Sequence, residues 1–342
     1  MIEWLSELGT FAVQVALLGL VVVVAVALLT RLRESGSERT RLRIEELNDR
    51  SRRRRRLLQL ASSIPGERKG LLKRFRRDDK RQRKASETPM PRCWVLDFQG
   101  DLKASRTSRF AEEISALLAV AEPEDEVVIR LESAGGLVHA YGLAAAQLDR
   151  LREAGLATRV CVDKVAASGG YLMACCAQHI QAAPFAVLGS IGVVAQVPNV
   201  HRLLKRHDVD VEVLTAGRYK RTLTVLGENS EEGREKFVED LEHTHELFKG
   251  FVAERRPALD IEAVATGEIW YGRDALEKGL IDELGTSEAY LLHRQETARV
   301  FSVRLEEHKR LGERLGMAVS RGVERGVERT LEALDASRWL KR

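Results

Sequence analysis

The sequence predicts an α/β fold, because short apolar segments alternate with longer segments of helical periodicity between about residues 92 and 290. The apolar segments are rich in valine, and the segments between them place apolar residues three and four positions apart. The expected strands are 93–98, 126–131 and 158–162, and the expected helices are 108–121 and 137–153. Alternation of this kind is typical of βαβ units, in which helices cover both faces of a parallel sheet.

Two of the expected strands end in a turn of small residues that leads into a helix. The first turn contains Gly135 and Gly136, and the second contains Ser168, Gly169 and Gly170. Ligands bind at the carboxyl ends of strands in an open α/β sheet, so we expect both turns to line one crevice. A serine at the start of a helix lies where unpaired backbone N–H groups favour the negative charge of a tetrahedral oxyanion. Taken alone, the second turn is explained equally well by an N-cap serine followed by a tight glycine turn.

The remainder of this region predicts further short elements. Residues 180–197 are apolar, but a proline and two glycines interrupt them, so we expect buried strands and turns rather than a membrane span. A helix near 200–206 and a strand at 209–214 follow. A long amphipathic helix then extends to about Glu254, with Asn229 as its expected N-cap. Two short helices and a closing turn are expected between 261 and 284.

The N-terminal segment predicts a membrane anchor. Residues 9–29 are 21 residues without a charge, which is long enough to span about 30 Å of hydrocarbon as a helix. A cleaved secretory signal would begin with basic residues, whereas the first eight residues contain Glu3 and Glu7 and no Lys or Arg. We therefore expect an N-terminal tail at 1–8 and one uncleaved transmembrane helix at 9–29.

The segment after the anchor, residues 30–91, is expected to be a basic juxtamembrane linker. Residues 31–92 contain 22 Lys+Arg and 9 Asp+Glu, although the whole chain has a net charge of only +4. A basic segment beside an anchor typically lies against anionic lipid headgroups, so membrane lipids are the expected partner. The segment lacks an aromatic stacking pattern, and no nucleic-acid partner is expected. By the positive-inside rule, the remainder of the chain faces the cytoplasm.

The C-terminal residues 291–342 predict an amphipathic helical extension. Beyond about Ser302 they are rich in Arg and Glu, and apolar residues recur at helical spacing. The apolar stripe is Leu311, Leu315, Val319, Val323 and Leu331. A helix of this kind is typical of a packing or oligomer contact, and contact with a membrane surface is the alternative.

The four cysteines do not predict a metal site. Cys93, Cys161, Cys175 and Cys176 lack the spacing of metal ligands, and we expect buried free thiols. No cofactor or metal is expected anywhere in the chain.

A serine nucleophile at position 168 would need a base to remove its proton. The chain has eight histidines, but none lies in a recognisable triad setting, and the Gly-x-Ser-x-Gly motif of α/β-hydrolases is absent. His139 follows the first glycine turn, where it is more typical of an ordinary helix histidine. Lys220 is the alternative, because an amine acts as a general base when burial lowers its pKa and leaves it neutral. Taken alone, Lys220 is more typical of a surface lysine in a basic loop.

Three motifs, in this order, resemble the signal peptide peptidase A family of serine–lysine peptidases. They are Val165-Ala-Ala-Ser-Gly-Gly-Tyr171, Gly189-Ser-Ile-Gly-Val193 and Ala216-Gly-Arg-Tyr-Lys-Arg221. Residues 271–285 are similar to the end of that family's catalytic domain, so the resemblance covers roughly residues 92–287. With the anchor and the basic linker, the chain is most similar to the bacterial inner-membrane members of the family.

The resemblance implies the roles of individual residues. Ser168 is the nucleophile and Lys220 is the general base. Ser190 hydrogen-bonds the lysine, and the N–H groups of Gly135 and Gly169 form the oxyanion hole. The family usually has proline where this chain has alanine before Gly135, a difference that removes no N–H donor.

The resemblance also implies a fold and an activity. The fold is a ClpP/crotonase-like α/β fold of repeated ββα units over residues 92–290. The activity is that of a membrane-anchored serine endopeptidase that needs neither metal nor ATP. Its substrates are membrane-derived or signal-peptide-like peptides, with misfolded proteins as a further class. Active sites in the family are shared between subunits, so a homo-oligomer is expected, with Lys220 out of reach of Ser168 inside one chain.

Two alternatives to this function remain open at the level of sequence. One is a catalytically idle membrane scaffold with a peptidase-like domain, and the other is a crotonase-type acyl-CoA enzyme. The presence of Ser168, Lys220 and Ser190 together argues against an idle scaffold. The expected location is the bacterial inner membrane. The charge rule places the catalytic domain on the cytoplasmic side, whereas the best-known relatives place theirs on the outer side.

Overall fold

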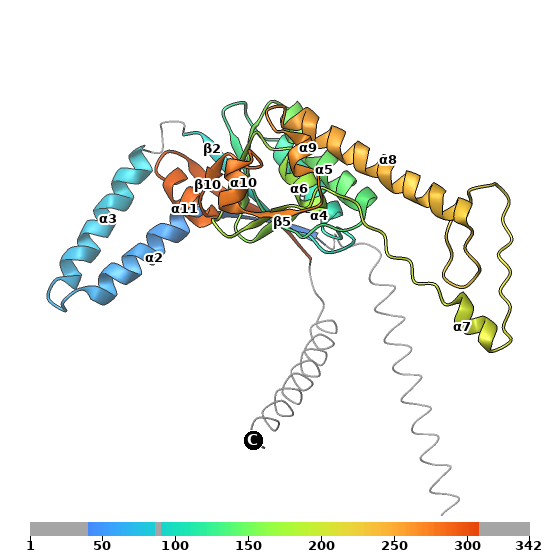
Figure 1. Cartoon of the computed structure of the whole chain (residues 1–342). Coiled ribbons are helices and arrows are strands. Elements are labelled where there is room, and N and C mark those ends of the chain that lie inside the picture. Colours follow the sequence, from blue (N-terminus) through green and yellow to red (C-terminus); the bar gives the residue numbers. More distant parts are fainter. Residues whose placement is uncertain (1–39, 86–89, 308–342) are drawn as a thin grey trace, which may run out of the picture. The chain divides into compact units, whose positions relative to one another are not determined.

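The computed structural model describes residues 40–85 and 90–307, and its architecture is mixed α/β (Figure 1). The strands are β1 (Thr40–Glu46), β2 (Arg92–Gln99), β3 (Glu126–Glu132), β4 (Ala157–Val162), β5 (Val165–Ala167), β6 (His179–Ala182), β7 (Val187–Gly189), β8 (Ile269–Tyr271), β9 (Glu283–Leu284) and β10 (Arg299–Glu307). The helices are α2 (Leu47–Ser62), α3 (Arg68–Ala85), α4 (Thr107–Leu118), α5 (Val138–Glu153), α6 (Gly169–Ala174), α7 (His201–Arg206), α8 (Glu231–Arg255), α9 (Ile261–Val264), α10 (Gly272–Glu277) and α11 (Ser287–Arg294).

Within the described residues, the strands form two sheets. The larger sheet has the order β1-β10-β2-β3-β4-β6-β9, and the strands from β10 to β9 all run parallel. The smaller sheet has the order β5-β7-β8, with β5 and β7 parallel and β8 antiparallel to β7. A single parallel bridge between Ser133 and Ala166 joins the end of β3 to the smaller sheet. The carboxyl ends of β3 and β5 are therefore held side by side.

The central strands are buried on both faces, as the sequence predicts. In β2, Trp94, Leu96 and Phe98 point into the main core, which also contains apolar side chains of α4, α5 and α6. The alternate residues Cys93 and Val95 point into a smaller core on the opposite face, together with residues of α2, α11 and β10. Successive side chains of a strand point to opposite faces, so a short run of apolar residues supplies both cores.

The expected strands and helices between 93 and 162 are confirmed to within three residues at each end. Residues 180–192 contain the short strands β6 and β7 with turns, as expected, whereas Val194 and Val197 are exposed rather than buried. The strand expected at 209–214 is wrong, because those residues have no regular structure. Val209, Val213 and Leu214 are exposed there, and no described strand lies beside them to accept their backbone hydrogen bonds.

The N-cap expected for the long helix is also wrong by one residue. The Ser230 hydroxyl accepts a hydrogen bond from the N–H of Gly233, so Ser230 caps α8. The Asn229 side chain instead accepts from the N–H of Thr224 and donates to the Thr224 carbonyl. Asparagine and serine both satisfy free backbone groups of this kind, and the loop before α8 decides which one caps the helix.

The C-terminal helical extension expected from residue 291 is wrong for residues 299–307. These form β10, which pairs with β2 in the register Val300 to Cys93. Val300 is buried in the smaller core and Val303 in the main core, so the strand is apolar on both faces and the domain continues past residue 290. Residues 308–342 lie outside the described part of the chain, as do the tail 1–8 and the anchor 9–29.

The basic segment 30–91 contains more than a linker, because residues 40–85 form β1, α2 and α3. Between residues 40 and 85 and between 90 and 307, no helix combines the length and apolar character needed to cross a membrane. The four cysteines are buried and free, which confirms that expectation.

An ion pair ties the helical layer to the edge of the larger sheet. Asp282 lies just before β9, and its carboxylate accepts two hydrogen bonds of 2.9 Å from Arg256 and one of 2.7 Å from the N–H of Ile180. Burial alone would raise the pKa of Asp282, but the hydrogen bonds from Arg256 and Ile180 outweigh burial and hold this pKa below its ordinary value. The charged carboxylate is therefore the form that stabilises the fold.

We predict that Asp282→Asn lowers the free energy of unfolding by about 1–3 kcal/mol at neutral pH, because the partly buried Arg256 loses its counter-charge. Since the folded pKa of Asp282 is depressed, this contribution is present above the unfolded pKa and disappears as the pH falls through the folded pKa. The stability difference between the two proteins, measured by urea denaturation, should therefore shrink on acidification.

The matched control is Glu232→Gln, which removes an exposed ion pair with Arg218. An exposed pair contributes little, so this change should cost less than about 0.5 kcal/mol. Equal losses in the two variants would contradict the structural role of Asp282.

Candidate active site

Ser168 occupies a strained turn between β5 and α6. Its backbone adopts φ 52° and ψ −121°, a region that serine rarely enters. The turn is held by two hydrogen bonds, one from the N–H of Ser168 to the carbonyl of Gly189 (2.8 Å) and one from the N–H of Leu172 to the carbonyl of Ser168 (3.0 Å). Backbone strain persists only where the surrounding structure holds it, and it is concentrated at active sites. A serine on a strained strand-to-helix turn is therefore typical of a nucleophile.

Ser190 lies beside Ser168. Strands β5 and β7 pair in parallel with Ala167 opposite Gly189, so the two serines are the next residues along adjacent strands. Ser190 also has a positive φ, 50°, and its N–H donates to the carbonyl of Glu268 at 2.6 Å. The register of the smaller sheet thus brings together two serines that are 22 positions apart in the sequence.

The turn after β3 packs directly against the Ser168 turn. A Cβ atom at Gly135 would lie 2.7 Å from the backbone nitrogen of Gly169 and 2.7 Å from the Cβ of Ser168, and Gly135 has φ +90°. Only glycine satisfies both the space and the backbone conformation. The backbones of Gly135 and Gly169 therefore lie in contact next to Ser168, where the sequence predicts an oxyanion hole. In this structure the N–H of Gly135 donates to Ser133 Oγ at 3.1 Å.

Two residues that the sequence analysis missed support this turn. Tyr141, on α5, is completely buried, and its hydroxyl donates to the carbonyl of Asp101 (2.8 Å) and lies 2.6 Å from Ser133 Oγ. A tyrosine has one hydroxyl proton, so Ser133 is the donor in the second contact and its lone pair is left for the N–H of Gly135. A Cβ at Gly169 would lie 2.4 Å from Cγ of the Tyr141 ring, so the ring also fixes the Ser168 turn. No sequence motif marks this role.

An apolar pocket of about 180 Å³ opens beside Ser168. Its walls come from α5, α6, α8 and the residues after β7, and they include Val138, Leu172, Val193, Leu247, Phe248 and Phe251. Ser168 and several glycines also line it. A side chain bound next to the serine would therefore meet an almost wholly apolar surface.

Lys220 lies on a different part of the chain. Residues 192–230, which we call the β7–α8 excursion, extend away from the core (Figure 1). The loop after α7 contacts the N-terminal end of α8, where Arg218 donates to Glu232. Lys220 is exposed on this excursion, and its backbone N–H donates to the carbonyl of Gly217. In the described chain, no hydrogen bond joins the Lys220 side chain to Ser168 or Ser190. The structure thus brings together Ser168, Ser190 and the two glycines, and it leaves the lysine outside this group.

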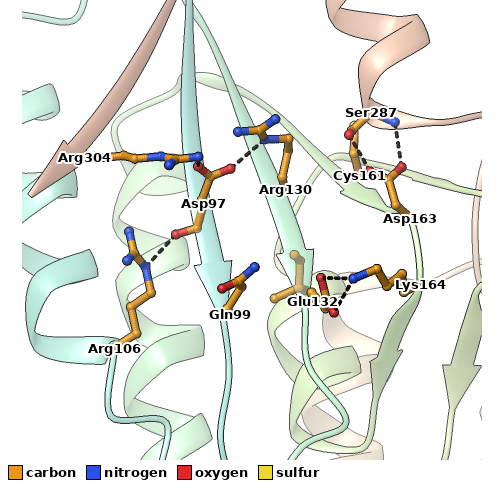
Figure 2. A pocket seen from close by; sticks show the side chains of 11 residues that line it. Asp97, Gln99, Arg106, Arg130, Glu132, Cys161, Asp163, Lys164, Ser287 and Arg304 are labelled. Atoms are coloured by element: carbon orange, nitrogen blue, oxygen red, sulfur yellow. Dashed lines mark hydrogen bonds and ion pairs between the residues drawn. The ribbon is translucent and has the colours of Figure 1, made fainter. Parts of the chain in front are cut away.

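A second, charged pocket lies on the face of the larger sheet that carries the smaller core (Figure 2). Its volume is about 330 Å³, and most of its charged side chains are paired. Asp97 accepts a hydrogen bond from Arg130 at 2.5 Å and pairs with Arg304, while Lys164 binds Glu132 at 2.9 Å. These pairs connect β2, β3 and β10 and the segment after β4, so we assign the cluster a structural role. In the described ranges, no group of three or more His, Cys, Asp or Glu side chains is placed to hold a metal ion.

We predict that Gly135→Ala slows the reaction of Ser168 with a fluorophosphonate by at least about 100-fold, because the added methyl displaces the backbone of Gly169 and with it the oxyanion site. The rate constant of labelling measures this directly. Gly250→Ala is the control, since Gly250 lies in α8, where an added methyl would meet no other atom and should only stabilise the helix. A normal labelling rate in folded Gly135→Ala protein would show that this close approach is dispensable.

Comparison with known proteins agrees with the geometry. The model of "Peptidase family S49 N-terminal" matches residues 3–148, and that of "Peptidase family S49" matches residues 150–300. "Probable protease SohB" of Haemophilus influenzae is 59% identical over 64% of this chain and 62% of its own length. "Probable protease SohB" of Buchnera aphidicola subsp. Schlechtendalia chinensis is 57% identical over 60% of this chain and 67% of its own length.

More distant proteins match as well. The chloroplastic "Serine protease SPPA" of Arabidopsis thaliana is 32% identical over 56% of this chain and 29% of its own length. A solved membrane-bound stomatin-specific protease aligns with 60% of this chain and 86% of its own, at 13% identity and a TM-score of 0.40, which is too low to assign a shared fold. The two family models together span nearly all of residues 3–300, and the SohB relatives share more than half of their aligned residues. The chain therefore belongs to peptidase family S49.

Proposed function

We propose that this protein is a membrane-anchored serine endopeptidase in which Ser168 attacks the peptide carbonyl and Lys220 is the general base. The observation that carries the proposal is the strained Ser168 turn, which lies beside Ser190 and in backbone contact with Gly135. This arrangement supports nucleophilic catalysis on a scaffold of strand–strand–helix units of the ClpP/crotonase-like kind, with β4 and β5 followed by α6, and β6 and β7 followed by α7 and α8.

The chemistry proceeds in two halves. The amine of Lys220 takes the proton of the Ser168 hydroxyl as its oxygen attacks, and it passes that proton to the leaving amine. The N–H groups of Gly135 and Gly169 stabilise the oxyanion. To do so, the N–H of Gly135 either turns away from Ser133 Oγ or donates to Ser133 Oγ and the oxyanion together. The same lysine then takes a proton from water as the water oxygen attacks the acyl-enzyme carbonyl, and it returns this proton to the Ser168 oxygen as the ester bond breaks and the new carboxyl end leaves. Ser190 holds the amine in line with Ser168.

The lysine comes from a neighbouring subunit in this proposal. Lys220 is exposed on the β7–α8 excursion, which also exposes apolar side chains such as Val194 (91%) and Leu214 (89%). Exposed apolar side chains gathered on one extended segment support a protein–protein contact. A homo-oligomer would cover them and place Lys220 of one chain at Ser168 of the next.

The apolar pocket beside Ser168 supports an apolar substrate class. Peptides derived from membrane segments or signal peptides offer such side chains, and unfolded proteins expose them too. A catalytically idle scaffold is the competing function, and reaction of the wild-type protein with a serine-directed phosphonate separates the two.

Membrane attachment through residues 9–29 completes the proposal. The 21 uncharged residues and the basic excess that follows them support an anchor in the bacterial inner membrane, with the peptidase domain on the cytoplasmic side. Co-purification of the full chain with lipid nanodiscs tests the attachment, and protease protection in spheroplasts tests the side.

We predict that Ser168→Ala and Lys220→Ala each lower cleavage of a casein substrate at least about 1,000-fold, because nucleophile and base act as a unit. His139→Ala should retain nearly all activity, since this exposed histidine has no part in the reaction. Thermal unfolding of each variant checks that the fold is intact. Activity that survives in Lys220→Ala and is lost in His139→Ala would replace the dyad with a histidine mechanism.

Mixing the two inactive variants tests the shared site. Subunit exchange between Ser168→Ala and Lys220→Ala proteins produces interfaces that carry both wild-type residues, so casein cleavage should return. When equal amounts mix at random, each of the two residues at a site is wild-type in about half of the cases. About a quarter of the sites should therefore be complete, and only complete sites should be active. Exchange confirmed by fluorescence energy transfer without any return of activity would place both residues in one subunit.

A further inference from the structure

The helices α2 and α3 form a hairpin that we call the basic hairpin, residues 47–85, and Figure 1 shows the two helices side by side. Arg56 of α2 joins them, with hydrogen bonds of 2.7 and 3.1 Å to the carboxylate of Asp79 and a further one to the carbonyl of Phe75. Its guanidinium also lies 5.0 Å from the centre of the buried Phe75 ring. A bidentate pair and a ring contact hold the two helices in one geometry.

The base of the hairpin is fixed to the peptidase domain. Leu47, the first residue of α2, is buried in the smaller core. The Asn48 side chain donates to the carbonyls of Gln295 and Ala298 and accepts from the N–H of Val300. These contacts use every part of the amide group, so the start of α2 has one orientation relative to α11 and β10. At about 1.5 Å per residue, the 16 residues of α2 carry the tip about 24 Å from this base.

The hairpin carries a large excess of positive charge. Residues 47–85 contain 16 Lys+Arg and 4 Asp+Glu. Arg53, Arg54 and Arg55 are exposed on α2, and no carboxylate in the described chain pairs with them. Exposed, uncompensated arginines attract an anionic surface and contribute little to folding.

The end of the hairpin exposes apolar side chains among charged ones, because Glu67, Arg68 and Lys69 are exposed there as well. Leu57 and Leu58, at the end of α2, and Ile64, in the connecting turn, are exposed by 66%, 71% and 67%, and Leu72 of α3 is also exposed. Surface leucines occur singly on most proteins, but here four exposed apolar side chains lie within 16 positions of the chain, in the last turns of α2, the connecting turn and the first turns of α3. Basic residues flank the group on both helices. An apolar tip behind a collar of Lys and Arg is the pattern of a segment that enters the boundary between lipid headgroups and acyl chains.

We propose that the basic hairpin docks on an anionic phospholipid bilayer, with Leu57, Leu58, Ile64 and Leu72 inserted among the lipids. The charge complementarity and the apolar tip together favour a bilayer over nucleic acid, which would use the charge and leave the leucines in water. The proposal rests on the membrane attachment proposed above, because the uncharged stretch that ends at Leu29 lies 18 residues before α2. The rigid base then sets the distance between the peptidase domain and the bilayer.

An environment-sensitive dye at the tip tests the docking. The full-length Ile64→Cys protein is reconstituted in nanodiscs of phosphatidylglycerol or of phosphatidylcholine. The natural cysteines are buried, and burial raises the pKa of the Cys161 thiol to about 12, so the dye goes to position 64. We expect a blue shift and quenching by a lipid-borne quencher in phosphatidylglycerol, and neither in phosphatidylcholine. The dye at Phe185→Cys, an exposed apolar site without a basic collar, should stay water-like in both.

Charge variants provide the matched comparison. Replacing Arg53, Arg54 and Arg55 with Gln should weaken the quenching at position 64. The equilibrium constant for docking of the tip on the lipid should fall by about fivefold for each arginine removed. Replacing Arg202, Lys205 and Arg206 of α7 with Gln removes the same charge elsewhere and should change nothing at the tip. Helix content by circular dichroism confirms that the hairpin is folded in both triple variants.

Three outcomes would overturn the proposal. A water-like dye in phosphatidylglycerol excludes insertion, equal signals in the two lipids exclude the anionic requirement, and a response to duplex DNA instead of lipid assigns the charge to nucleic acid.

Retention of the chain on nanodiscs separates this proposal from the anchor. Retention on both nanodiscs reports the anchor, retention on phosphatidylglycerol alone reports the hairpin without an anchor, and retention on neither refutes both.

Discussion

The active-site region depends on the close approach of two backbone turns, one after β3 and one between β5 and α6. At Gly135 and Gly169 the two turns are so near that a single added methyl group would overlap backbone or ring atoms. Gly170 obeys the same limit, because a Cβ there would lie 2.4 Å from the carbonyl oxygen of Ser133. The bridge between Ser133 and Ala166 sets this distance, and the strained backbone of Ser168 persists because both sides of the turn are held.

The Tyr141 and Ser133 hydroxyls have a second effect besides support. The donor order runs from Ser133 to Tyr141 to the carbonyl of Asp101, so the lone pair of Ser133 faces the N–H of Gly135. A buried N–H without an acceptor is costly, and Ser133 supplies one while no substrate is bound. Burial also raises the pKa of Tyr141, which keeps the phenol neutral and its donor role unchanged. The turn is thus preorganised, and the N–H of Gly135 has an acceptor.

Two segments project from the packed core, the β7–α8 excursion and the basic hairpin. Ser168 and Ser190 lie on paired strands in the core, whereas Lys220 lies on the exposed β7–α8 excursion. Phe248 and Phe251, in the second half of α8, pack against the core, while the first half of α8 leaves it together with the excursion. At the N-terminal side the basic hairpin has the same design, with a base fixed by Asn48 and a tip that stands free. In the proposed function, this design lets a neighbouring subunit supply Lys220 without disturbing the strained turn.

The sequence by itself determined the α/β class, the strands from 93 to 162 and the approach of the Gly135 turn to Ser168, because local periodicity and short motifs record which side chains must be buried and which turns need glycine. Ser190 was added by the resemblance to a known family. The sequence did not reveal the Tyr141 and Ser133 network, since that network joins residues whose partners are chosen by packing between separate elements. The tertiary structure alone decided that 299–307 is a strand, because β2 offered it a free edge, and that 209–214 is not, because no edge lies beside it. It also decided that the basic segment folds as a hairpin, through the pairing of Arg56 with Asp79 across 23 positions of the chain. A strand or a helix pair exists only where a partner presents its hydrogen bonds or its charge, and the order of residues along one chain does not state where that partner will be.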